Sequence, residues 1–182
     1  RDVAYSSDGK IIATASKAAR LWSATDGSPL SPPLIHPESV QDVALSRDGE
    51  ILVTGGTDGS TRVWSVKRAQ EILPPLGQGG SVDISQDRGL VATGDDMQVK
   101  LWDLESGQPT GMVLAHDGLV RDVTFSANGR WLLTASDDAN VRFWSVETGE
   151  QIGPNLLPFS DAIPLECVFS PEGKNAVIAD HL

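Results

Sequence analysis

The sequence predicts an all-β chain that repeats one structural unit about every forty residues. Two sets of landmark residues recur in register. Turn glycines lie forty residues apart, at Gly9, Gly49, Gly89 and Gly129. Tryptophans recur at nearly the same interval, at Trp22, Trp64, Trp102 and Trp144. Self-similarity at a fixed period indicates a repeat architecture, and no segment shows the competing helical periodicity.

Each unit is predicted to hold four short strands joined by turns. In the second unit the pattern places them at roughly 40–46, 51–57, 61–66 and 71–76. The second strand is almost continuously apolar or small, as expected for a strand covered on both faces. Asp-Gly and Asn-Gly pairs after the first strand favour type I′ hairpin turns. Prolines in the fourth strand place it at a sheet edge, because proline cannot donate to a strand ladder.

Composition and charge exclude several classes of protein. The 40% hydrophobic and 21% charged residues are typical of a globular chain rather than a disordered one. The net charge of −11 opposes binding to a phosphate backbone, so no nucleic acid partner is expected. No apolar run is long enough to cross a bilayer, so no membrane partner is expected either. The single cysteine, Cys167, rules out an internal disulfide framework and fits a reducing, cytoplasmic location.

Four polar residue types recur at fixed spacing inside two of the units. One set is His36, Thr54, Asp58 and Trp64, and the other, with identical spacing, is His116, Thr134, Asp138 and Trp144. A tryptophan donates one N–H, an aspartate accepts, and a threonine hydroxyl does both. The four types can therefore form a continuous chain of hydrogen bonds.

Three recurring segments carry a family resemblance. D-V-A-x-S-x-D-G, T-G-G-T-D-G-S-T-R-V-W and T-A-S-D-D-A-N-V-R-F-W resemble segments of the WD-repeat β-propeller family. Proline-rich outer strands leading into histidine resemble those of bacterial members, some of which carry the repeats behind a Ser/Thr kinase domain. The resemblance implies four-stranded antiparallel blades, here an incomplete propeller of four blades and part of a fifth. It predicts one partial propeller over 1–182, with units at roughly 1–36, 37–78, 79–116, 117–159 and 160–182.

In that family the His, Thr, Asp and Trp of a unit form a structural tetrad inside each blade, and the resemblance assigns this role to the two sets above. The third unit has Pro75 where the histidine is expected, and the first unit lacks both the histidine and the aspartate. An orphaned buried polar group costs about 1–3 kcal/mol. We therefore expect the first and third blades to be less rigid than the second and fourth.

Catalytic and ligand-binding interpretations of the same residues are less favoured. Residues that could serve as metal ligands, bases or a nucleophile are His36, His116, Cys167 and the pairs Asp95-Asp96 and Asp137-Asp138. All stand at positions that the repeat itself explains, and no EF-hand loop, nucleophile elbow or phosphate-binding loop accompanies them. A basic residue two positions before each tryptophan could hold an anion or serve the repeat, at Arg20, Arg62, Lys100 and Arg142. The sequence predicts no enzyme, no metal and no cofactor.

Positions that vary from unit to unit are the candidates for binding a protein partner. In the resembled family, residues near these positions reach the face where partners dock, and here they are Arg1, Gln41, Thr57, Asp95, Arg121 and Asp137. Large and charged groups that differ between blades suit a specific, non-symmetric interface. Ordinary solvated surface is the alternative for each of them.

Taken with the resemblance, these features predict a non-catalytic scaffold that binds protein partners through its blade-end loops. The alternative is a sensor or substrate-docking region of a larger bacterial signalling enzyme such as a Ser/Thr kinase. The remaining blades of a full-length chain are a further expected partner, because an open arc exposes strand edges at both ends.

Overall fold

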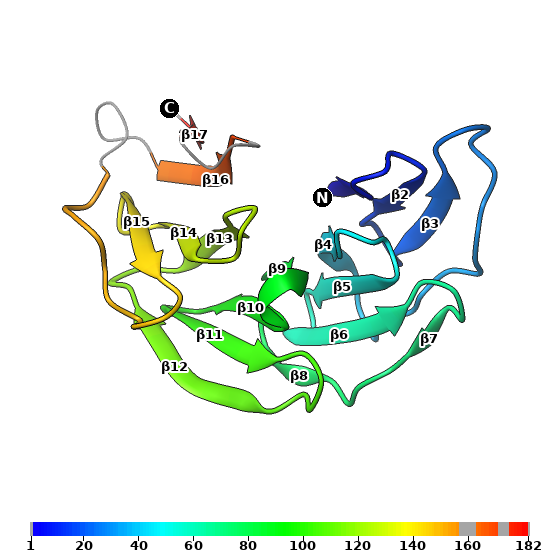
Figure 1. Cartoon of the computed structure of the whole chain (residues 1–182), viewed down its shortest axis with the longest axis horizontal. Coiled ribbons are helices and arrows are strands. Elements are labelled where there is room, and N and C mark those ends of the chain that lie inside the picture. The colour runs from blue at the N-terminus through cyan, green and yellow to red at the C-terminus, as the bar shows by residue number, and fades with distance from the viewer. Residues whose placement is uncertain (1, 157–162, 171–174, 182) are drawn as a thin grey trace.

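The computed structural model describes residues 2–156, 163–170 and 175–181, and places five antiparallel sheets side by side along an open arc (Figure 1). Each sheet is one blade, and its first strand lies at the inside of the arc. The arc leaves a gap between the first blade and the fifth. The single helical element among the described residues is the short 3-10 helix η1, Gln86–Arg88. The prediction of an all-β, incomplete propeller is confirmed.

The strands follow one another in chain order within each blade. The first blade holds β1 (Val3–Tyr5), β2 (Ile11–Thr14) and β3 (Arg20–Ser23). The second holds β4 (Val40–Leu45), β5 (Ile51–Gly56), β6 (Ser60–Ser65), β7 (Gln70–Glu71) and β8 (Leu76–Gln78). The third holds β9 (Ser81–Ser85), β10 (Leu90–Asp95), β11 (Gln98–Asp103) and β12 (Pro109–Ala115). The fourth holds β13 (Val120–Phe125), β14 (Trp131–Ser136) and β15 (Asn140–Ser145), and the fifth β16 (Ile163–Phe169) and β17 (Ala176–His181).

The outer, fourth strand is where the sequence pattern and the fold differ most. In the second blade the strand expected at 71–76 splits into β7 and β8, both paired with β6, because Pro74 and Pro75 interrupt the ladder. In the first and fourth blades it shrinks to isolated bridges, Ala19↔Leu34 and Trp22↔Pro29, and Val141↔Leu156 and Trp144↔Gln151. Only in the third blade is a described fourth strand continuous, as the seven residues of β12.

The hairpin turns after the inner strands are not of type I′, which corrects the expectation from the sequence. Gly9, Gly49 and Gly129 have φ of 68°, 70° and 64°, whereas the Asp or Asn before each has no positive φ. That side chain instead accepts from a nearby serine. Ser46 Oγ donates to Asp48 Oδ1 at 2.7 Å, and the Glu50 N–H donates to the same oxygen at 3.0 Å. This side-chain bonding closes a longer turn that needs left-handed backbone only at the glycine.

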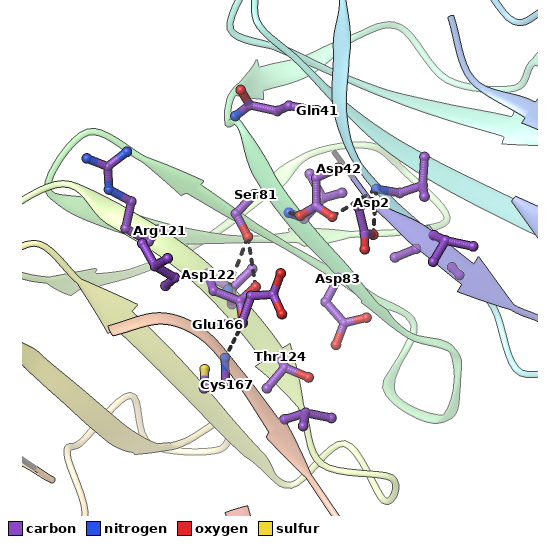
Figure 2. A pocket seen from close by; sticks show the side chains of 18 of the residues that line it. Asp2, Gln41, Asp42, Ser81, Asp83, Arg121, Asp122, Thr124, Glu166 and Cys167 are labelled. Carbon is purple, nitrogen blue, oxygen red and sulfur yellow. Dashed lines mark hydrogen bonds between the residues drawn. The ribbon is translucent and has the colours of Figure 1, made fainter. Parts of the chain in front are cut away.

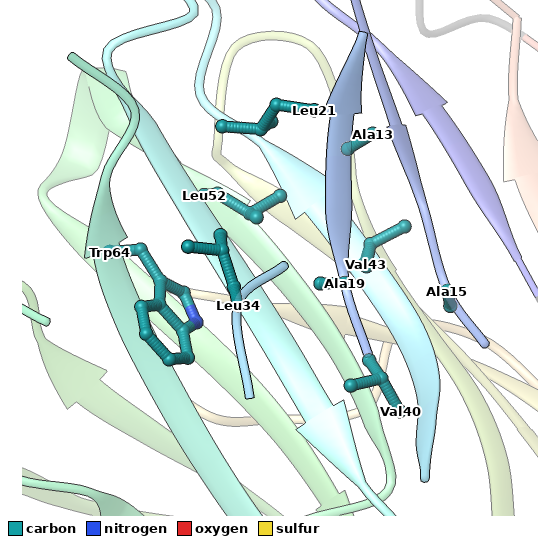
Figure 3. Packing of buried hydrophobic residues seen from close by; sticks show 9 residues of the cluster. All are labelled: Ala13, Ala15, Ala19, Leu21, Leu34, Val40, Val43, Leu52 and Trp64. Atoms are coloured by element: carbon teal, nitrogen blue, oxygen red, sulfur yellow. The ribbon is translucent and has the colours of Figure 1, made fainter. Parts of the chain in front are cut away.

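The hydrophobic core is divided among the interfaces between neighbouring blades. Figure 3 shows one such cluster, in which Leu21 and Ala13 of the first blade pack against Leu52 and Trp64 of the second. Val53, the next residue of β5, packs on the opposite face in a cluster shared with the third blade. Leu52 and Val53 are both fully buried. The second strand is therefore covered on both faces, as its continuous apolar pattern predicted.

The first and third blades, which the sequence predicts to be less rigid, differ in how much of the fold surrounds their strands. Ala13 in β2 and Ala92 in β10 occupy equivalent positions and are both 0% exposed. The β2 strand belongs to a sheet of three short strands whose outer face leaves Val3 and Tyr5 exposed. The β10 strand instead lies inside a complete four-stranded sheet with a blade on each side.

We expect the Ala13 amide to exchange with deuterium faster than the Ala92 amide, because fewer buried contacts hold the first blade closed. Residue-resolved hydrogen exchange measures this. Equal protection of the two amides, or faster exchange at Ala92, would contradict the assignment of lower rigidity to the first blade.

Candidate functional site

The tetrad residues of the second blade form a continuous chain of hydrogen bonds. Trp64 Nε1 donates to Thr54 Oγ1 at 2.8 Å, and Thr54 Oγ1 lies 2.7 Å from His36 Nε2. His36 Nδ1 lies 3.5 Å from Asp58 Oδ1. Because the Asp58 carboxylate can only accept, we assign the proton of the neutral His36 to Nδ1, facing Asp58, and Nε2 then accepts from the Thr54 hydroxyl. The four side chains tie β5, β6 and the segment before β4 together.

The corresponding residues of the fourth blade are joined differently. Trp144 Nε1 donates to Thr134 Oγ1 at 2.9 Å, but His116 Nε2 has no hydrogen-bond partner in the described part of the chain. The buried Arg142 lies between the histidine and the aspartate, and its Nη1 donates to His116 Nδ1 and to Asp138 Oδ2. His116 therefore accepts through Nδ1, which is the reverse of His36.

In the first and third blades only one bond of the tetrad is present. Trp22 Nε1 donates to Thr14 and Trp102 Nε1 to Thr93, both at 3.0 Å. A threonine thus anchors the tryptophan in four blades, whether or not a histidine is available.

Burial governs the protonation of both histidines. It lowers the pKa of His36, against the opposing effect of Asp58. Burial and the neighbouring Arg142 lower the pKa of His116 to about 4. Both imidazoles are therefore neutral at physiological pH, where they serve as hydrogen-bonding parts of the blade interior.

A hollow of about 710 Å³, which we call the central hollow, lies along the inner strands of the five blades. Acidic side chains line it from one end of the arc to the other (Figure 2): Asp2, Asp42, Asp83, Asp122 and Glu166. Gln41 and Arg121 lie at its margin. Three of these carboxylates, Asp2, Asp42 and Asp122, belong to an Asp-Val pair that recurs in the sequence, but the common location of all five follows only from the packing of the blades.

The aspartates of the central hollow bond each blade to the next. Asp42 Oδ2 accepts from the N–H of Val82 at 2.7 Å, across the interface between the second and third blades. Asp122 Oδ2 accepts from the N–H of Cys167 at 2.7 Å, between the fourth and fifth blades. In each case a carboxylate on one inner strand satisfies a main-chain donor on the next inner strand.

The third blade makes the same connection with two side chains. Ser81 stands where the second and fourth blades have aspartate, and its Oγ accepts from the N–H of Val123 at 3.1 Å. Asp83, two residues further along β9, accepts from the N–H of Phe125 at 2.6 Å. Asp2 makes a longer contact of 3.4 Å with the N–H of Val43. These inter-blade side-chain-to-amide bonds occur at all four blade interfaces.

Three of these aspartates, Asp42, Asp83 and Asp122, have raised pKa values, because folding removes them from water. Burial raises the pKa of Asp83 to about 7, although two main-chain N–H groups donate to it. Burial also raises the pKa of Asp42 well above its usual range, with Asp2 adding to the effect. The pKa of Asp122 is raised for the same reason. Burial of these three carboxylates is therefore costly in free energy, and each accepts a main-chain N–H from the neighbouring blade.

The candidate partner-binding residues divide into two groups. Gln41 and Arg121 line the central hollow, and the Gln41 side chain lies over Gly80 of the next blade. Thr57, Asp95 and Asp137 stand at the turns after the second strands and do not line it. Arg1 lies outside the described residues.

Most of these side chains are paired within the molecule. Arg121 Nε and Nη2 donate to the two carboxylate oxygens of Asp137, each at 2.5 Å. This bond raises the pKa of Arg121. Thr57 Oγ1 donates to Glu38 or to the Ser39 carbonyl. Asp95 lies 3.5 Å from Lys100. Arg121 and Asp137, both candidates for partner binding from the sequence, thus form one ion pair in the fold.

Two exposed apolar residues lie on segments that are bonded to this region and were not singled out from the sequence. The N–H of Asp137 donates to the carbonyl of Leu119, and Met97 accepts from the N–H of His116 through its carbonyl. Met97 is 51% and Leu119 44% exposed. We call Met97, Leu119, Arg121, Asp137 and Gln41 the blade-end surface. Exposed leucines are common in folded proteins, so only their position next to variable charged residues distinguishes them.

The remaining candidates for chemistry are engaged inside the fold. Arg20 lies over the Trp22 ring, Arg62 pairs with Glu71, and Arg142 is bonded as above, so these cations serve their own blades. Cys167 is buried, and burial raises the pKa of its thiol well above the usual range. Within the described ranges no group of three or more His, Cys, Asp or Glu side chains has the geometry to hold a metal ion. No helix in the described chain is both long and apolar enough to cross a membrane.

Comparison with known proteins places the repeat in a family. A family model described as "WD domain, G-beta repeat" matches residues 32–65, 80–103 and 107–145, more than half of the chain. The chain is 31% identical over 133 residues to Transducin beta-like protein 3 of Bos taurus, covering 68% of this chain and 17% of that protein. It is 30% identical over 153 residues to WD repeat-containing protein 36 of Homo sapiens, covering 81% and 17%.

A third relative is Nuclear distribution protein PAC1-2 of Uncinocarpus reesii, 28% identical over 154 residues that cover 69% of this chain and 33% of that protein. The chain thus spans between 17% and 33% of the length of these relatives. All three come from eukaryotes and none has a kinase name, so they give no support to a bacterial type or to the kinase alternative.

Replacing Thr54 by valine should lower the free energy of unfolding by about 2–4 kcal/mol, because both the Trp64 N–H and the His36 ring nitrogen lose their buried partner. The matched control is Thr93→Val, which has the same 0% exposure and loses only the Trp102 bond. The Thr93→Val variant should lose about 1–2 kcal/mol of unfolding free energy. Urea unfolding of the two variants measures the difference, and equal losses would show that the histidine bond contributes nothing.

The buried Asp83 should make stability depend on pH. Its pKa is about 7 when folded against an ordinary 3.8, so the folded state binds more protons between these values. Its contribution is therefore present at low pH and lost as the pH rises through about 7. Relative to Asp83→Ser, the native free energy of unfolding should fall by about 2 kcal/mol between about pH 5.5 and about pH 8.

Urea unfolding at several pH values tests this dependence, and the comparison between variants removes the opposing titration of the histidines. Asp87→Ser is the matched control, since Asp87 lies in the adjoining turn with its side chain 47% exposed. An Asp83→Ser variant with the same pH dependence as the native chain would contradict the buried, proton-binding state of Asp83.

Proposed function

The chain belongs to the WD40 repeat family, and from this premise we propose that it is a non-catalytic scaffold that binds a protein partner at the blade-end surface. The observation that carries the proposal is the composition of this surface. Exposed Leu119, whose carbonyl accepts from the N–H of Asp137, stands beside the bidentate Arg121–Asp137 pair. Exposed Met97 lies in the turn of the third blade that is bonded to Val120. An apolar centre beside an arginine is the usual make-up of an energetically important contact.

The scaffold works by holding this surface in a fixed shape. The turn that carries Asp137 is bonded to Leu119, and the turn that carries Asp96 accepts from the N–H of Val120 at 2.6 Å. The Arg142–Asp138–His116 network lies directly behind the same turns. A partner that binds here therefore orders few side chains, which reduces the entropic cost of association.

We also propose that further blades of a full-length chain continue the arc. Glu166 occupies on β16 the position of Asp42 and Asp122, and lines the central hollow with them. An inner strand placed after the fifth blade would offer an N–H to Glu166, as Val82 does to Asp42. The cytoplasmic location remains a proposal that rests on the lone cysteine.

Charge reversal at Arg121 should abolish partner binding. Arg121→Glu places a second carboxylate against Asp137, and Leu119→Asp removes the adjoining apolar contact. Quantitative affinity purification from matched extracts should recover a partner set with the native chain that both variants lose. The matched control is Arg68→Glu, an exposed site in the turn after β6, at the opposite end of the blades. Retention of the same partners by all three variants would remove the blade-end surface from the proposal.

A further inference from the structure

One arginine position is used differently in the second and fourth blades. Arg62 on β6 and Arg142 on β15 each lie two residues before the blade tryptophan. Arg62 Nη1 donates outward, to Glu71 Oε1 on β7. Arg142 Nη1 instead donates inward, to His116 Nδ1 and to Asp138 Oδ2. Two blades of the same chain thus show two positions of an equivalent side chain.

Each position leaves a buried polar atom without a hydrogen-bond partner. Among the described residues, the two such side-chain atoms are Arg62 Nε and His116 Nε2. With Arg142 inward, the His116 ring accepts through Nδ1, so its proton is on Nε2 and has no acceptor. In the second blade the same ring nitrogen instead lies 2.7 Å from Thr54 Oγ1. Because neither position satisfies every group, the surrounding residues decide between them.

The first difference in the surroundings lies on the outer segment of the blade. The strand register places Glu71 and Gln151 at equivalent positions, each opposite the blade tryptophan. A carboxylate holds a guanidinium by charge-assisted hydrogen bonds, and an amide offers no such charge. The Gln151 amide is turned to its own segment, where it donates to Asn155 Oδ1 at 2.9 Å. The fourth blade therefore has an amide where the second has the carboxylate that holds Arg62.

The second difference lies at the inner carboxylate. Ser60 Oγ lies 2.9 and 2.8 Å from the two oxygens of Asp58, so the second blade supplies this carboxylate with a hydroxyl donor. Asn140 is the equivalent residue of the fourth blade, and its side-chain amide donates to the main-chain carbonyl of Asp138 at 2.8 Å. The Asn140 side chain thus leaves Asp138 Oδ2 to Arg142.

We propose that the fourth-blade arginine has two alternative positions, inward and outward, and that Gln151 and Asn140 together select the inward one. In the outward position Arg142 bonds to a carboxylate on the outer segment, and His116 completes the chain of hydrogen bonds that the second blade has. Gln151 is in this way a positioning residue, which acts on the blade interior through Arg142.

The inward position also ties together two segments of the blade-end surface. Arg142 Nη2 lies 3.4 Å from Asp117 Oδ2. The N–H of Asp117 donates at 3.0 Å to Asp138 Oδ2, the same oxygen that Arg142 contacts. Asp117 lies two residues before Leu119, and Asp138 directly follows Asp137. This consequence rests on the proposed function of the blade-end surface, whereas the two arginine positions do not.

NMR of the nitrogen-labelled imidazole rings at neutral pH tests the proposal, because the protonated ring nitrogen reports where the arginine lies. In the native chain the proton should be on Nε2 of His116 and on Nδ1 of His36. In the double variant Gln151→Glu, Asn140→Ser it should move to Nδ1 of His116, with His36 unchanged. The Asp137 amide should then exchange with deuterium severalfold faster, because its segment loses the tie through Arg142.

Two further variants complete the test. Asn155→Asp is the matched control, since it adds the same charge to the same segment, and it should leave the His116 proton on Nε2. The reciprocal double variant Glu71→Gln, Ser60→Asn should move the His36 proton from Nδ1 to Nε2, and does so independently of the stability of the fourth blade.

A His116 proton that stays on Nε2 in the folded double variant, or that moves equally in Asn155→Asp, would overturn the proposal, as would a reciprocal variant with an unmoved His36 proton. A moved His116 proton without faster exchange at Asp137 would overturn the link to the blade-end surface, and would leave the proposed partner binding to its own test.

Discussion

The contact between one blade and the next is the interaction on which the rest of this structure depends. No blade has a core of its own, because the buried side chains of each sheet complete their packing only on the neighbouring sheet. At the inside of the arc the apolar contact is reinforced by a polar one, in which a buried carboxylate or hydroxyl accepts from a main-chain N–H of the following inner strand. Repeat proteins are stabilised by such nearest-neighbour terms, and here the polar term also fixes the register between blades.

The polar network inside each blade is secondary to these interfaces and therefore tolerates variation. A single Trp–Thr bond is present in all four of the blades that carry a tryptophan. Histidine and aspartate continue the chain of hydrogen bonds fully only in the second blade. In the fourth blade, Arg142 instead donates to both the histidine ring nitrogen and the aspartate carboxylate. The loss of the histidine from the third blade is compatible with four intact strands, because packing on both faces holds its sheet.

Much of the fold could be predicted from the sequence because it depends on local patterns that recur. The spacing of Gly49 and Trp64 located the first three strands of the second blade to within about a residue, and the apolar run of β5 correctly indicated two covered faces. The division of the fourth strand at Pro74 was harder to predict, since proline allows either an edge strand or a break. The turn type was wrong because a serine–aspartate bond competes with the type I′ geometry.

The candidate site was predictable only in part, since it depends on contacts between residues that are far apart in sequence. Neither the bond from the Val82 N–H to Asp42 nor the exposure of Met97 and Leu119 follows from any local pattern. The central claim, that buried carboxylates link the blades, is tested most directly by NMR measurement of scalar couplings across these hydrogen bonds. Couplings from the Asp42 carboxyl carbon to the Val82 amide nitrogen, and from Asp122 to Cys167, are expected in the folded chain. Their absence from a chain whose strand-to-strand couplings are observed would contradict the account.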